Sequence, residues 1–185
     1  MPVKMKDLSL HILDIVQNSI RANALTVTVS LIVDKDNYLH LSVIDNGTGM
    51  DKYQLERVKD PFFSTRTTRK IGLGVPLLAQ KAEASGGFIS VKSKEGKGTE
   101  LLASFLLTHP DCPPLGDIPE CAWMLMASSP GIRMIFKFKG AMNECEWDSD
   151  QIRTELGGIP LTEKEVMTGI LEWFKLDFSN FKGNI

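Results

Sequence analysis

Two alternating segments near the N-terminus most restrict what this chain can fold into. In residues 26–33 one face of the pattern is apolar and consists of Val27, Val29, Leu31 and Val33. Such alternation is typical of a half-buried strand. Turn-forming residues 34–37 follow, and a second alternating run then carries Leu39, Leu41 and Val43. The two segments are therefore expected to form an antiparallel hairpin with one buried face.

The segments around this hairpin predict a layer of helices over a sheet. Two have helical periodicity and two have strand patterning: residues 7–22, 75–85, 88–93 and 99–107. Residues 51–72 are polar, basic and irregular, and a loop of this length often serves as a lid. Residues 1–108 are therefore expected to form a two-layer α/β sandwich, with a mostly antiparallel sheet and helices on one face.

A proline-rich stretch at 109–119 reads as a linker. Beyond it, residues 120–185 are expected to form a small C-terminal α+β module, whose role is open between partner recognition and a structural extension. Its expected helices and strands are 116–128, 132–139, 143–147, 149–156 and 163–175. Thr162, with Glu165 three residues on, fits the capping box of the last helix.

Charge and hydropathy exclude two classes of partner. The formal net charge of -2 gives no bulk attraction to nucleic acid. No apolar run approaches the roughly 20 residues of a membrane-spanning helix. The first residues lack the unbroken apolar stretch of a signal peptide. The sequence therefore predicts a cytoplasmic protein without a membrane or nucleic-acid partner.

The first polar motif lies on the first expected helix. Asp14 and Asn18 are four residues apart and so face the same way, with His11 and Arg21 extending the stripe. Mg²⁺ prefers oxygen ligands and often bridges substrate phosphates. An amide oxygen with a carboxylate one turn earlier would suit that task. A plain solvated helix face is the alternative.

The second motif follows the second strand, where Asp45 precedes Gly47 and Gly49 in the run Asp-Asn-Gly-Thr-Gly-Met. A buried aspartate at a strand end can accept a hydrogen bond from the amino group of adenine. Glycines let the backbone approach a ring closely. An ordinary Asp-Asn-Gly turn is the alternative.

Two further motifs lie downstream. Arg66, Arg69 and Lys70 are candidate phosphate-binding cations, and Gly72-Leu73-Gly74 leads into a helix whose first amides favour phosphate oxygens. Thr99 follows a Gly-Lys-Gly turn and could offer its hydroxyl to a buried ligand. The alternatives are a solvated loop and a plain hairpin turn.

In order and spacing, the four motifs together resemble the GHKL (Bergerat-fold) ATPase superfamily, closest to the histidine-kinase-like ATP-binding domain, over roughly residues 7–107. The resemblance implies ATP and Mg²⁺ as cofactors, with Asn18 as metal ligand and Asp45 as the adenine-reading aspartate. The full set of expected nucleotide-binding residues is Asn18, Ala22, Asp45, Gly47, Gly49, Met50, Phe62, Thr67, Arg69, Lys70, Gly72, Leu73, Gly74, Val75 and Thr99.

The resemblance also frames the function. Histidine kinases usually carry Asn where Asp14 stands, whereas hydrolytic and serine-kinase branches carry Glu. Asp14 is therefore the candidate catalytic base, or else it only orients Asn18 or a metal-bound water. We expect an ATP·Mg-binding regulatory protein that acts as a slow ATPase or as a kinase on a separate partner protein. The alternative is an ATP-gated protein-interaction module without significant catalysis.

Overall fold

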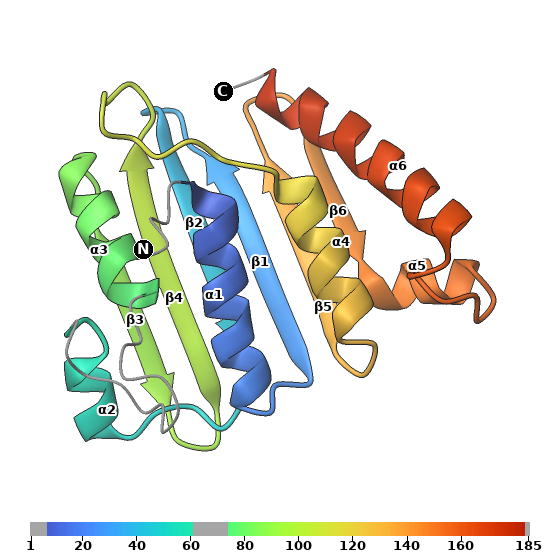
Figure 1. Ribbon diagram of the computed structural model, residues 1–185. Helices are drawn as coiled ribbons and strands as arrows, with labels where there is room; N and C mark the ends of the chain where they lie inside the picture. Colours follow the sequence, from blue (N-terminus) through green and yellow to red (C-terminus); the bar gives the residue numbers. More distant parts are fainter. Residues whose placement is uncertain (1–6, 61–73, 184–185) are drawn as a thin grey trace, which may run out of the picture.

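The computed structural model describes residues 7–60 and 74–183 (Figure 1). The helices in these residues are α1 (Leu8–Arg21), α2 (Lys52–Arg57), α3 (Gly74–Ala84), α4 (Ile118–Ser128), α5 (Ser149–Glu155) and α6 (Lys164–Lys182). The strands are β1 (Thr26–Val33), β2 (Tyr38–Asp45), β3 (Ile89–Lys94), β4 (Gly98–Leu106), β5 (Arg133–Lys139) and β6 (Glu144–Asp148).

The strands form one sheet in the order β3-β4-β2-β1-β5-β6. Every neighbouring pair is antiparallel except β1 and β5, which run parallel. Helices α1, α3, α4 and α6 lie over the same face of this sheet (Figure 1). The expected two-layer α/β sandwich is therefore confirmed.

The predicted hairpin is the centre of the sheet. Val29 of β1 lies opposite Val43 of β2, and Leu31 lies opposite Leu41. All four side chains are buried, because alternate residues of each strand face the helical layer. Helix α1 covers them with an apolar stripe at helical spacing, formed by Leu8, Ile12, Ile15 and Val16.

The sheet and the core continue across the proline-rich stretch. Strand β5 pairs with β1 over seven residues, so that Val29 lies opposite Phe136. The amide of Leu8 donates to the Pro114 carbonyl, and α4 packs against α1. Both halves contribute to a single cluster of buried apolar side chains. The division into domains of residues 1–108 and 120–185 stays a prediction, and any such domains share one sheet.

Three local expectations were wrong. Residues 51–60 are not all loop, because Asp51 and Gln54 form a reciprocal capping box that begins α2. Glu163, not Thr162, occupies the N-cap of α6, because the helix begins one residue later than expected. Helix α6 also continues past residue 175, because its buried apolar stripe extends through Phe178 to Phe181.

Candidate functional site

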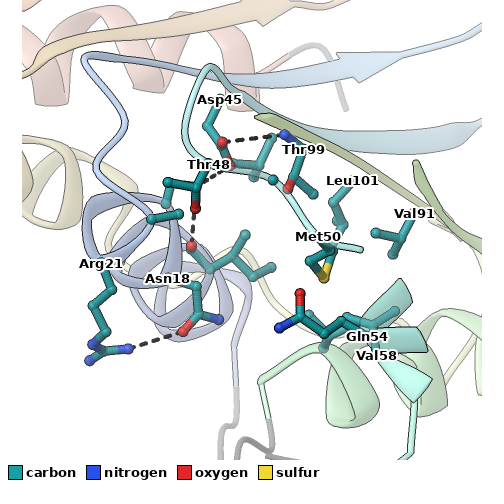
Figure 2. A pocket seen from close by; sticks show the side chains of 16 residues that line it. Asn18, Arg21, Asp45, Thr48, Met50, Gln54, Val58, Val91, Thr99 and Leu101 are labelled. Carbon is teal, nitrogen blue, oxygen red and sulfur yellow. Dashed lines mark hydrogen bonds between the residues drawn. The ribbon is translucent and has the colours of Figure 1, made fainter. Parts of the chain in front are cut away.

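A cavity of about 340 Å³ lies between α1, the end of β2 and the inner face of β3 and β4. This volume is within the range of small-molecule sites. Its lining combines an apolar wall with a few polar groups (Figure 2). The lining residues are Ile15, Asn18, Ser19, Arg21, Ala22, Val43, Asp45, Thr48, Gly49, Met50, Gln54, Val58, Val75, Val91, Thr99 and Leu101.

The Asp45 carboxylate lines this cavity and makes hydrogen bonds with three neighbours. Its Oδ1 accepts hydrogen bonds from the backbone amides of Gly47 at 2.9 Å and Thr99 at 3.3 Å. Its Oδ2 accepts a 2.7 Å hydrogen bond from the Ser19 hydroxyl. The Ser19 hydroxyl is also 3.5 Å from the Ile15 carbonyl, but it has one proton and donates it in the shorter hydrogen bond to Asp45. The carboxylate of Asp45 is thus held in one orientation by three donors.

Glycines let the loop after β2 pass close to its neighbours. Gly49 has a φ of 68°, and a Cβ added there would lie 2.2 Å from the Lys94 carbonyl oxygen. Any other residue would therefore push the loop out of place. The amide of Thr48 donates to the Ala22 carbonyl at 2.7 Å, which ties the same loop to the end of α1.

The end of the cavity beside α1 is polar and includes the positively charged side chain of Arg21. The Arg21 guanidinium donates to Asn18 Oδ1 at 3.0 Å, and both side chains lie on the α1 side of the cavity (Figure 2). An amide oxygen is a ligand that suits Mg²⁺, which usually takes its other oxygens from phosphates and water. Within residues 7–60 and 74–183 there is no group of three His, Cys, Asp or Glu side chains that could hold a metal alone. Asn18 offers one oxygen, so a Mg²⁺ ion here would need its other oxygens from a phosphate ligand and water.

Asp14 and His11 lie behind the cavity, towards the start of α3. A Cβ on Gly74 would lie 1.9 Å from Asp14 Oδ2, so a larger residue there would require the Asp14 side chain to move. His11 is 1% exposed, and its ring lies near the Gly74 backbone and the Asp14 side chain. Burial lowers its pKa, although the Gly74 backbone and the nearby Asp14 partly oppose that shift. The ring is therefore held in its neutral form.

The structure brings together most of the predicted residues that it describes. Those that line the cavity are Asn18, Ala22, Asp45, Gly49, Met50, Val75 and Thr99. Asp14, Gly47 and Gly74 do not line it, but Gly47 donates to Asp45 and Gly74 contacts Asp14. The remaining predictions lie outside the described residues: Phe62, Thr67, Arg69, Lys70, Gly72 and Leu73.

Several lining residues were not predicted. Val43, Val91 and Leu101 form the apolar wall, and strand alternation alone could have placed them on the inner face. Gln54 and Val58 come from the α2 region, which was expected to be loop. Ser19 gave no signal of its own, because only the fold shows that it faces Asp45.

Comparison with known sequences supports a nucleotide site. A family described as histidine kinase-, DNA gyrase B-, and HSP90-like ATPase matches residues 4–110. The chain is 39% identical over 111 residues to the sensor protein kinase FleS of Pseudomonas aeruginosa, covering 59% of this chain and 27% of that protein. It is 38% identical over 81 residues to the sensor histidine kinase WalK of Bacillus subtilis, covering 40% and 13%. The chain thus matches only a minor part of the length of these relatives.

Among solved structures, the N-terminal domain of a DNA repair protein superimposes with a TM-score of 0.52. The match covers 77% of this chain and 52% of that one, at 15% sequence identity. Identity this low indicates a common fold and nothing more specific.

Proposed function

Because the chain belongs to the family of histidine kinase-, DNA gyrase B- and HSP90-like ATPases, we propose that it is a regulatory protein that binds ATP with Mg²⁺ in this cavity and acts on a separate partner protein. The observation that carries the proposal is the Asp45 carboxylate, which lines the cavity and is fixed by three hydrogen bonds. The proposed reaction is slow ATP hydrolysis or transfer of the γ-phosphate to the partner.

Asp45 supports adenine as the base. A carboxylate offers about four acceptor positions, and the protein occupies three of them. One position on Oδ2 is left for a donor from the ligand, and an exocyclic amine supplies one. The apolar wall, which includes Val91 and Leu101, would cover a face of the ring.

With the base at Asp45, the phosphates would extend towards Asn18 and Arg21 (Figure 2). Asn18 would provide an oxygen to the metal, and Mg²⁺ would offset the charge on the phosphate oxygens. The Arg21 guanidinium lies beside that oxygen and can pair with a phosphate. The two side chains would thus hold the phosphate end of the nucleotide in one place.

The position of Asp14 favours a second candidate function. A general base has to reach the attacking oxygen directly or through one water. Asp14 does not line the cavity, and its Oδ2 is buried against Gly74. If Asp14 only supports the start of α3, the protein would serve as an ATP-gated interaction module without significant catalysis.

Incubation with γ-labelled ATP·Mg²⁺, alone and with cell extract, separates these functions. Released phosphate supports the ATPase, and label on another protein supports the kinase. Neither signal, together with measurable ATP binding, supports the interaction module. The Asp45→Asn variant is the control for contaminating enzymes. At an ATP concentration near the wild-type dissociation constant, a signal that comes from this protein should fall in the variant. Failure of the wild-type protein to bind ATP would overturn the proposal.

A further inference from the structure

Ser93 lies behind the cavity wall and does not line it. It is on β3, directly opposite Thr99 of β4. Its hydroxyl oxygen accepts the Met50 amide at 2.8 Å, and it lies 2.9 Å from the Gly98 carbonyl and 3.0 Å from Thr99 Oγ1. Three polar groups, one from the loop after β2 and two from β4, therefore meet at one hydroxyl.

Counting protons fixes the direction of each of these hydrogen bonds. A serine hydroxyl has one proton and two lone pairs. The Met50 amide is only a donor, so it takes one lone pair of Ser93. The Gly98 carbonyl is only an acceptor, so it takes the proton. The remaining lone pair can then bond to Thr99 only if the Thr99 hydroxyl donates its own proton.

This arrangement determines what the cavity offers to a ligand. Because its proton points back to Ser93, the Thr99 hydroxyl can present only lone pairs to the cavity. The Asp45 carboxylate, beside Thr99 in Figure 2, is also an acceptor and already accepts a hydrogen bond from the Ser19 hydroxyl. The side chains of Asp45 and Thr99 together therefore offer acceptors and no donor at this end of the cavity.

We propose that Ser93 is a positioning residue for base recognition: it orients the Thr99 hydroxyl as an acceptor, so that the cavity selects 6-amino purines and rejects 6-oxo purines. The proposal rests on the proposed ATP site, with the base at Asp45. An amino group at position 6 donates to these acceptors. A carbonyl at position 6 would instead face their lone pairs, and an unsatisfied buried acceptor pair is unfavourable.

The test compares ADP with IDP by calorimetric titration in the presence of Mg²⁺. Their bases differ at position 6 and also at N1, which is an acceptor in ADP and carries a proton in IDP. The quantity of interest is the ratio of the IDP to the ADP dissociation constant. In Ser93→Ala the Thr99 hydroxyl can rotate and donate to a 6-oxo group. The ratio should therefore fall roughly 2- to 10-fold, the value of one net hydrogen bond. An unchanged or increased ratio would overturn the proposal.

Val91→Ala is the matched control. Val91 is two residues away on the same strand and lines the cavity, but it has no polar group to orient. Its truncation should weaken ADP and IDP to the same extent and leave the ratio unchanged. If Val91→Ala lowers the ratio as much as Ser93→Ala does, loss of shape explains the effect and the proposal fails.

Thr99→Val tests the direction of the hydroxyl without touching Ser93. If Thr99 is an acceptor, its loss weakens ADP more than IDP and the ratio falls. If Thr99 is a donor, the ratio rises and the proposal is wrong. In the Thr99→Val background, Ser93→Ala should no longer change the ratio. This variant keeps the test decisive even if Ser93→Ala does not fold.

If the proposed ATP site itself is wrong, different measurements show it. In that case the wild-type protein binds no ADP, or Asp45→Asn binds ADP as tightly as the wild type does. Either result would overturn the base-recognition proposal as well. If Asp45→Asn weakens ADP binding, but the IDP-to-ADP ratio does not change in the Ser93 and Thr99 variants, only the role of Ser93 is overturned.

Discussion

Replacing Asp45 with Asn isolates the ligand-facing part of its carboxylate. In Asp45→Asn, the retained oxygen can still accept from the Gly47 and Thr99 amides. The new amide nitrogen replaces Oδ2, and the Ser19 hydroxyl can turn to accept from it. The protein side of the network is therefore preserved, whereas the acceptor for an adenine amine becomes a donor.

The expected loss in affinity follows from that exchange. A hydrogen bond to a charged group contributes about 1.5–3 kcal/mol, which corresponds to roughly 10- to 150-fold in the dissociation constant. Calorimetric titration with ATP·Mg²⁺ measures the change, and thermal unfolding shows whether the variant stays folded. Tm should change little, because the three protein hydrogen bonds to this side chain remain possible.

Asp36→Asn provides the matched control. Asp36 is an exposed residue of the turn between β1 and β2, whereas Asp45 is the last residue of β2. The same loss of a carboxylate there should leave ATP affinity unchanged. A folded Asp45→Asn protein with wild-type affinity would refute the assignment of Asp45 to the base.

Three further predictions concern the surroundings of the site. Asp14→Asn should leave ATP affinity unchanged. A general base contributes about 10²–10⁴-fold to the rate. A loss of turnover on that scale would support Asp14 as the base, whereas unchanged turnover would refute that role. A chain ending at Thr108 should lose its cooperative unfolding transition, because β1 loses its β5 partner and α1 loses α4; a folded, ATP-binding fragment would instead establish the domain boundary. His11→Leu should weaken the pH dependence of Tm. Burial lowers the pKa of His11 in the folded protein, so the wild-type protein loses stability as pH falls below about 6.5, where the unfolded chain binds the proton more readily. An identical pH profile of Tm in both proteins would contradict this.

The local elements were predictable where the sequence has a clear period. The alternation that ends at Val33 and the helical spacing of Ile12, Ile15 and Val16 gave β1 and α1 almost to the residue. In the candidate site, the sequence indicated the local positions of Asp45 at the end of a strand and of Gly49 in a turn, where the structure has a positive φ.

Long-range pairing was not predictable in the same way. The pattern of residues 132–139 indicates a strand, but it does not contain the information that this strand joins β1 in parallel. The roles of two serine side chains could not be predicted from the sequence either. Ser19 and Ser93 are small polar residues whose roles depend on what the fold places opposite them, Asp45 and Thr99 respectively.

Hydrogen exchange with and without ATP·Mg²⁺ tests the central claim most directly, because it locates the nucleotide without any substitution. The account predicts slower exchange on ATP addition at the end of α1, in residues 46–50 after β2, and at the start of β4. Strands β5 and β6 do not line the cavity and should exchange at the same rate in both conditions. Protection centred on β5 and β6, with no change at residues 46–50, would contradict the account.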